Sequence, residues 1–190
     1  MRKLISIAAG AAIATTLVAG VTSAAAAPTT VAAAGMSHTI SAVNPDVIAS
    51  NERTAFNYFV ARGLTKRQAA GIVGNLDQES GMDPTIKQYG GGPGRGIAQW
   101  SVGGRWDTIS GDNEVHYTNV VLGVSRWNLD GQLKFIWHEL TAIGYGYSNL
   151  KATTTIDGAT SVFASKYEIC GNCNLAARES FAHSAYNKYA

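Results

Sequence analysis

Apolar residues recur at helical intervals along most of the chain beyond its first fifty residues. Phe56, Phe59 and Val60 share one face of a first predicted helix, which we expect to begin at about residue 51. Gly63 followed by Leu64 is typical of a glycine C-cap with its hydrophobic contact. The pattern therefore predicts a helix that ends just before Gly63.

A second helix is predicted directly after Thr65, because Thr65 and Gln68 have the spacing of a capping box. Its apolar stripe consists of Ala69, Ile72, Val73 and Leu76. Gly71 and Gly74 lie opposite that stripe, and each disfavours a helix by about 1 kcal/mol relative to alanine. These glycines indicate a neighbour packed close to that face, although glycines tolerated on an exposed surface give the same pattern.

Three more helices are predicted towards the C-terminus. One follows Asn128 and is apolar on two sides, one begins at Thr155, and the last begins at about Asn174. The stretch that precedes Asn128 is broken by glycines and is expected to hold one short helix or strand. Arg178 falls beside the apolar stripe of the last helix. A charge placed there needs a partner such as Glu168, unless the side chain lies along the surface.

Glu79 is the chief candidate for chemistry. At about 100° per residue, its carboxyl projects from the edge of the apolar stripe of the second helix. Apolar surroundings penalise the charged form of a carboxyl, so Glu79 is expected to stay protonated to a higher pH and to act as a general acid. Ser80 and Gly81 end the helix, and the glycine-rich loop 90–96 that follows can approach a ligand closely.

Two motifs in this stretch resemble the phage tail lysozyme-like domain family. They are Gly-Asn-Leu-x-x-Glu-Ser-Gly at residues 74–81 and Gly-Ile-Ala-Gln-Trp at residues 96–100. The similarity covers about residues 52–189, and it is looser to goose-type lysozymes and lytic transglycosylases. Other matching parts are Gly104-Arg105-Trp106, Gln132-Leu133-Lys134-Phe135 with Glu139-Leu140, Tyr167-Glu168, and Arg178 in the last helix.

The resemblance implies an α+β domain that is predominantly α-helical, with a lysozyme-like fold and a catalytic cleft. It implies a monomeric glycosidase acting on peptidoglycan glycan strands, at the linkage from N-acetylmuramic acid to N-acetylglucosamine. Glu79 is the expected catalytic residue, and no cofactor or metal is expected. The expected substrate-binding residues are Ser80, Tyr89, Gln99, Trp100 and Trp106. Of these, Trp100 and Trp106 either stack on sugar faces or simply pack in the core.

A hydrolase of the usual kind needs a second carboxylate. It lies about 5 to 5.5 Å from the first if configuration is retained, and about 6.5 to 9.5 Å away if configuration is inverted. Asp83, Asp107 and Asp112 are candidates, and no family motif selects among them. A lytic transglycosylase closes the substrate on itself and can work with one acid. The sequence therefore leaves hydrolase and transglycosylase open.

Two other functions fit parts of the sequence. A non-catalytic cell-wall binding protein would keep the cleft, but it has no need of an isolated, half-buried acid. A cell-wall peptidase would use Cys170 or Cys173 with His183. In an exported chain these two cysteines, the only ones, are instead expected to form a disulfide. Because that bond is far in sequence from Glu79, we expect its loss to reduce stability more than activity.

The N-terminus has the features of a secretory signal peptide over residues 1–27. A basic start is followed by an apolar stretch, which is too short and too diluted by Thr and Gly for a membrane anchor, and then by small residues. Residues 28–50 have no period and are expected to form a linker or pro-segment, with a docked strand as the alternative. Residues 51–190 would then be an exported catalytic domain that acts at the cell wall without a membrane anchor.

Charge argues against two classes of partner. Once Arg2 and Lys3 are removed with the signal peptide, 13 basic residues balance 13 acidic ones. A near-neutral chain offers no basic surplus for nucleic acid or for an anionic membrane surface. The mature protein is therefore not expected to bind either of them.

Overall fold

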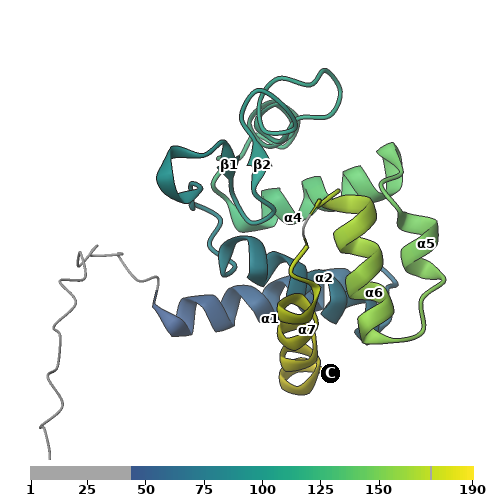
Figure 1. The fold of residues 1–190 in the computed structure, drawn as a ribbon. Coiled ribbons are helices and arrows are strands. Elements are labelled where there is room, and N and C mark those ends of the chain that lie inside the picture. The colour runs from purple at the N-terminus through teal and green to yellow at the C-terminus, as the bar shows by residue number, and fades with distance from the viewer. Residues whose placement is uncertain (1–43, 172) are drawn as a thin grey trace, which may run out of the picture. The chain divides into compact units, whose positions relative to one another are not determined.

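The structure is a computed structural model that describes residues 44–171 and 173–190. It is mainly helical, as predicted (Figure 1). The longer helices are α1 (Pro45–Ala61), α2 (Lys66–Ser80), α4 (Leu129–His138) and α7 (Leu175–Tyr189), and the shorter ones are α3 (Glu114–His116), α5 (Tyr147–Lys151) and α6 (Ile156–Val162). No helix in this described part is both long enough and apolar enough to cross a membrane.

Short helical turns and one small sheet complete the fold. The π-helical turns η2 (Tyr117–Val121), η3 (Glu139–Ile143) and η4 (Phe163–Tyr167) extend α3, α4 and α6, and a 3₁₀ turn η1 spans Tyr89–Gly91. Strands β1 (Gly94–Arg95) and β2 (Trp100–Ser101) pair antiparallel. The glycine-rich loop is therefore folded into a hairpin. The hydrogen bonds of this hairpin fix the position of Trp100.

Helix α2 is the central element, and α1, α6 and α7 pack against it (Figure 1). Its apolar stripe is fully buried. On the opposite face, a Cβ atom at Gly71 would lie 2.7 Å from the backbone nitrogen of Thr160 on α6, and one at Gly74 would lie 2.5 Å from the backbone nitrogen of Ala182 on α7. Such distances are too short for any side chain. This confirms the prediction that the two glycines admit close neighbours.

The predicted ends of α2 are confirmed. Thr65 and Gln68 form both hydrogen bonds of the capping box, and Gly81 ends the helix in the left-handed conformation. The predicted start of α1 is wrong, because this helix begins at Pro45, six residues before the expected position. The side chain of Asn44 caps it, and proline suits the first helical turn because it lacks an N–H that needs a partner. The predicted signal peptide and most of the predicted linker lie outside the described residues.

Other predicted elements are also present. Asn128 and Thr155 cap α4 and α6 through their side chains, and α7 follows Asn174. The irregular stretch before Asn128 contains a helix, α3 with η2, and not a strand. Helix α5 was not predicted, because its five residues are too few to show a helical period.

Candidate functional site

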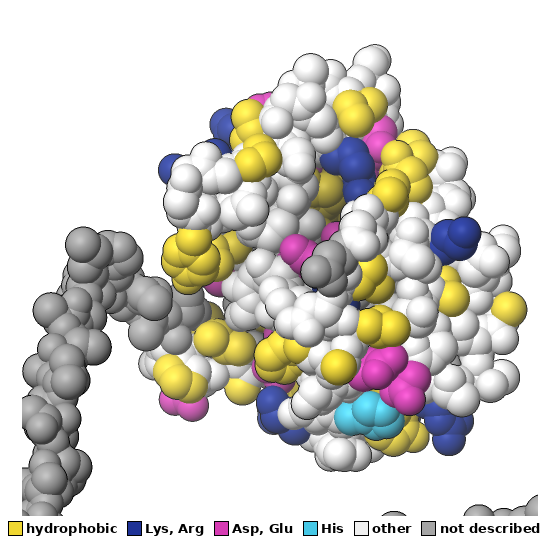
Figure 2. Space-filling model, viewed as in Figure 1, with side chains coloured by type: hydrophobic (Ala, Val, Ile, Leu, Met, Phe, Trp, Pro, Cys, Tyr) yellow, Lys and Arg dark blue, Asp and Glu magenta, His cyan; other side chains and the backbone are white. Residues whose placement is uncertain are grey.

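Glu79 lies in the last turn of α2, where two adjacent pockets share its side chain. The disulfide pocket, of about 360 Å³, is lined by Glu79, Ala98, Gln99, Trp100, Ser101, Arg105, Glu168, Ile169 and Cys170. The loop pocket, of about 440 Å³, is lined by Glu79, Ile86, Gln88, Tyr89, Pro93, Gln99 and Ser101. Figure 2 shows the hollow on this face, with acidic and basic side chains inside it.

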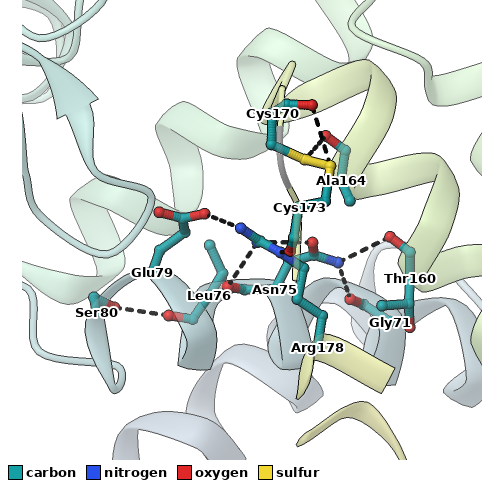
Figure 3. Close-up of polar contacts among 10 residues, drawn as sticks. All are labelled: Gly71, Asn75, Leu76, Glu79, Ser80, Thr160, Ala164, Cys170, Cys173 and Arg178. Carbon is teal, nitrogen blue, oxygen red and sulfur yellow. Dashed lines mark hydrogen bonds and ion pairs between the residues drawn. A yellow bond between two sulfur atoms is a disulfide. The ribbon is translucent and has the colours of Figure 1, made fainter. Parts of the chain in front are cut away.

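The carboxylate of Glu79 forms an ion pair with Arg178, which is 5% exposed (Figure 3). Arg178 is held in place by two further contacts. Its Nη1 donates to Oδ1 of Asn75 at 3.0 Å, and its Nε donates to the carbonyl of Cys173 at 2.5 Å. The partner of Arg178 is therefore Glu79, and neither Glu168 nor the solvent takes that place.

This ion pair changes what was expected of Glu79. The sequence placed the carboxyl at the margin of an apolar stripe and predicted that it would stay protonated. In the structure the guanidinium of Arg178 faces it instead. Glu79 therefore faces a fixed cation and not only apolar side chains.

Asn75 helps to fix the position of Arg178. Its Nδ2 donates to the carbonyl of Gly71 at 2.7 Å and to that of Thr160 at 3.1 Å, so its Oδ1 is turned towards Arg178 (Figure 3). Asn75 is fully buried between α2 and α6. Gly71 lets α6 pack closely against α2, and this packing orients Asn75. Asn75 in turn positions Arg178 for its ion pair with Glu79.

Cys170 and Cys173 are joined by a disulfide, as predicted. A bonded cysteine has no thiolate, so the cysteine peptidase alternative is lost. The bond is remote from Glu79 in sequence but not in space. Cys170 lines the disulfide pocket, and the carbonyl of Cys173 accepts the hydrogen bond from Arg178 (Figure 3). The expectation that loss of this bond reduces stability more than activity rested on its distance from Glu79 in sequence, and that distance is not kept in space.

Reduction of the disulfide should lower activity on peptidoglycan by about tenfold, which corresponds to about 1.4 kcal/mol of lost positioning. Without the bond, the loop that carries the Cys173 carbonyl no longer fixes Arg178. Activity before and after reduction checks this, with the redox state read by intact mass. A protein in which both cysteines are replaced by serine is the control, since it should have the lower activity and not respond to reductant. Full activity in protein proved to be reduced would contradict the prediction.

Two of the predicted substrate-binding residues face the pockets. Gln99 lines both, and its Nε2 donates to the carbonyl of Gly96 at 2.9 Å. Its backbone has a φ of 48°, an unusual value for a residue with a side chain. Tyr89 lines the loop pocket and is 72% exposed. Both side chains are available to a ligand.

The other three are largely structural. Ser80 is buried, and its hydroxyl donates to the carbonyl of Leu76 at 2.9 Å within α2. Trp106 is 3% exposed, packs on Trp100 and Trp127, and lines neither pocket. Trp100 is 2% exposed but contributes part of the wall of the disulfide pocket. Of the two alternatives left open for the tryptophans, packing is the one that the structure shows for Trp106.

A buried acid that the sequence did not indicate as a site residue holds two residues of the pocket wall in place. Glu139 in η3 is fully buried and accepts from Nε of Arg105 at 2.6 Å, from Nε1 of Trp100 at 3.1 Å and from the hydroxyl of Tyr167. Burial raises the pKa of Glu139, while Arg105 and Tyr167 oppose that shift. The two motif residues Arg105 and Trp100 are thus tied to one carboxyl in the core.

The three aspartates considered as a second carboxylate line neither pocket. Asp83 accepts from Thr85, and Asp107 accepts from the backbone of Gly103, which holds the pKa of Asp107 below its usual value. Asp112, the third, is buried and bonded to a tyrosine hydroxyl. None of them shares a wall with Glu79.

Glu168 is the other acidic residue that lines the disulfide pocket with Glu79. Its Oε1 is buried and has no hydrogen-bond partner among the described residues. Burial, and then the negative charge of Glu79, raise the pKa of Glu168 well above its usual range. Sequence reasoning placed Glu168 in a matching motif and considered it as a partner for Arg178, but not as a residue of the site. Its position directly after the buried Tyr167 was the available signal that part of its side chain reaches the interior.

Comparison with known proteins agrees with this arrangement. No curated protein matches the chain at a significant level. Residues 50–189 match the family described as phage tail lysozyme, a span that contains both pockets, the disulfide and every residue of the Glu79 ion pair. The chain therefore belongs to the phage tail lysozyme family.

Proposed function

We propose that this protein is a glycosidase that cleaves the N-acetylmuramic acid to N-acetylglucosamine linkage of peptidoglycan, with Glu79 as the proton donor. Membership of the family supports a general lysozyme-like activity that degrades peptidoglycan. The bond and the catalytic residue are our proposal. The observation that carries them is the position of Glu79 in the wall shared by two adjacent pockets.

That position suits cleavage between two sugars. A glycan strand that runs from one pocket into the other has one ring on each side of Glu79, so the linking oxygen comes close to the carboxyl. Gln99 and Ser101 also line both pockets and offer an amide and a hydroxyl to the sugars at this point. Glu79 is the acidic residue that the two pockets have in common.

Arg178 supports proton donation electrostatically. As Glu79 transfers its proton to the glycosidic oxygen, its carboxyl acquires negative charge, and the guanidinium of Arg178 is already fixed against it. A preorganised charge of this kind stabilises the transition state without reorganisation. The ion pair is therefore consistent with Glu79 as the donor, provided that substrate binding supplies Glu79 with a proton.

Product analysis tests the bond and the reaction type together. Purified peptidoglycan would be digested and the soluble fragments analysed by mass spectrometry. A new reducing end on N-acetylmuramic acid is expected for a hydrolase, and an end lighter by one water, closed as an internal ring, for a lytic transglycosylase. New ends on N-acetylglucosamine would show that the bond is wrong. Binding to peptidoglycan without any release of fragments would favour a non-catalytic cell-wall protein.

Gln99→Ala should lower turnover on peptidoglycan by about three- to tenfold, the effect of one lost hydrogen bond to a neutral group. The melting temperature should change little, because within the described residues the side-chain amide of Gln99 is bonded only to the carbonyl of Gly96. Gln78→Ala on α2 is a matched control, since Gln78 lines neither pocket. A Gln99→Ala variant as active as the control would remove Gln99 from the substrate contacts.

Export by residues 1–27, and action outside the cell as a monomer, remain part of this proposal. These residues lie outside the described part of the chain. Mass analysis of protein secreted by its host should find the N-terminus near residue 28. Retention of the intact N-terminus on secreted protein would contradict cleavage there.

A further inference from the structure

We propose that Glu168 is the second acidic group of this site and that it shares a single proton with Glu79. The inference rests on the proposed glycosidase function and adds to it the source of the proton that Glu79 donates. Glu168 follows η4, far from Glu79 in sequence, yet both side chains line the disulfide pocket.

The contacts of the two carboxyl groups differ. Glu79 has Arg178 as a fixed partner. Oε1 of Glu168 is buried and has no hydrogen-bond partner in the described part of the chain. A buried carboxylate without a partner is strongly unfavourable, whereas a buried carboxylic acid is tolerated. This difference in contacts favours the proton on Glu168 and leaves Glu79 paired with Arg178.

Five charged or titratable groups surround Glu168. Glu79 on α2 and Glu139 in η3 disfavour a negative charge on it, Arg105 after β2 and Arg178 on α7 favour one, and the neighbouring Tyr167 is neutral. Burial is the largest influence, and it raises the pKa of Glu168. Because two negative charges in one pocket disfavour each other, the pair takes up and releases protons as a unit.

The proton can be followed through one turnover. When substrate enters, the proton moves from Glu168 to Glu79, either directly or through water in the disulfide pocket, and Glu168 becomes the carboxylate beside Arg105. Glu79 then gives the proton to the glycosidic oxygen as the carbon–oxygen bond breaks. The attacking hydroxyl, from water or from the sugar itself, forms the new carbon–oxygen bond and returns its proton to the pair. The pair ends with the one proton with which it began.

The first experiment needs no substrate and no activity. The carbonyl stretch of the protonated carboxyl of Glu168 is followed by infrared difference spectroscopy during a pH titration of the whole protein, and Glu168→Gln identifies the band by its loss. In Glu79→Gln the titration midpoint should fall by at least one pH unit, because a negative neighbour is removed and the charge of Arg178 is no longer neutralised by Glu79. An unchanged midpoint would overturn the shared proton. It would do so even if the protein proved inactive on peptidoglycan.

The second experiment uses the pH profile of activity. In Glu168→Gln, Glu79 must hold its own proton beside Arg178, so the alkaline limb should move to lower pH by about one unit or more. A loss of stability alone does not move this limb when rates are expressed per folded molecule. The matched control is Glu114→Gln, which replaces another buried, unpartnered carboxyl that lines neither pocket and should leave the limb in place. A parental limb in Glu168→Gln would overturn the proposal, and if that variant does not fold, the titration in Glu79→Gln decides alone.

Discussion

Glu79→Gln should lower turnover on peptidoglycan by about 10²- to 10⁴-fold, the loss expected when a general acid is removed. Glutamine keeps the shape of the side chain and can still accept a hydrogen bond from Arg178, but it has no acidic proton to give. Binding to peptidoglycan should persist, because the linings of both pockets are otherwise intact. The measurement is the rate of fragment release per folded molecule, with binding assayed separately.

Glu179→Gln on α7 is the matched control for that change, since Glu179 lines neither pocket. It should release fragments at the parental rate. Should Glu79 serve only to anchor Arg178, the Glu79→Gln protein would be less stable, and its activity would fall only in proportion to the unfolded fraction. A folded variant with near-parental turnover would falsify the role of Glu79 as acid.

The stability of the protein should fall as pH rises from about 5 to 8. Glu114 is fully buried, neither of its carboxyl oxygens has a partner in the described residues, and burial raises its pKa from 4.5 to about 8. Between these two values the folded protein keeps a proton that the unfolded chain has lost, so rising pH favours unfolding. Each unit of difference in pKa is worth about 1.4 kcal/mol, so Glu114 alone contributes several kcal/mol. Asp77, whose pKa burial raises to about 7, acts in the same direction.

Denaturant unfolding at several pH values measures this effect. The free energy of unfolding should be greatest near pH 5 and should level off above pH 8. In Glu114→Gln, which stays neutral at every pH, the slope should become clearly smaller, and Asp77 should account for part of the slope that remains. A free energy of unfolding that increases between pH 5 and pH 8 would show that Glu114 is charged in the folded protein.

Local rules predicted the elements of this fold well. The capping box at Thr65, the glycine end at Gly81 and the cap at Thr155 all depend on residues within four positions of one another, and all are confirmed. Gly71 and Gly74 also gave information about packing. Because glycine disfavours a helix, their presence indicated close neighbours, which only the structure identified. The start of α1 was missed, because Asn44-Pro45 was not interpreted as a helix cap followed by a proline in the first turn.

The site was predictable only in part, because its geometry depends on contacts between distant segments. Glu79, Gln99 and Tyr89 were located by motif and position, and they do line the pockets. The partner of Glu79 comes from 99 residues further along the chain, and helical periodicity carries no information about such a pairing. The same reason explains why Glu168 was not recognised as lining the same pocket as Glu79.

Arg105 belongs both to the wall of the site and to the core. A mutation at Arg105 therefore affects the evolution of substrate specificity and the stability of the core together. Arg105 lines the disulfide pocket, while its Nε binds the carboxylate of Glu139 and its Nη1 donates to the backbone of Tyr167 at 2.9 Å. A substitution there that improves the fit of a new sugar leaves a buried acid without its cation, at a cost of about 3 to 5 kcal/mol. Changes of specificity are therefore tolerated more easily in the loop pocket. There the exposed Tyr89 can be exchanged without disturbing any buried charge.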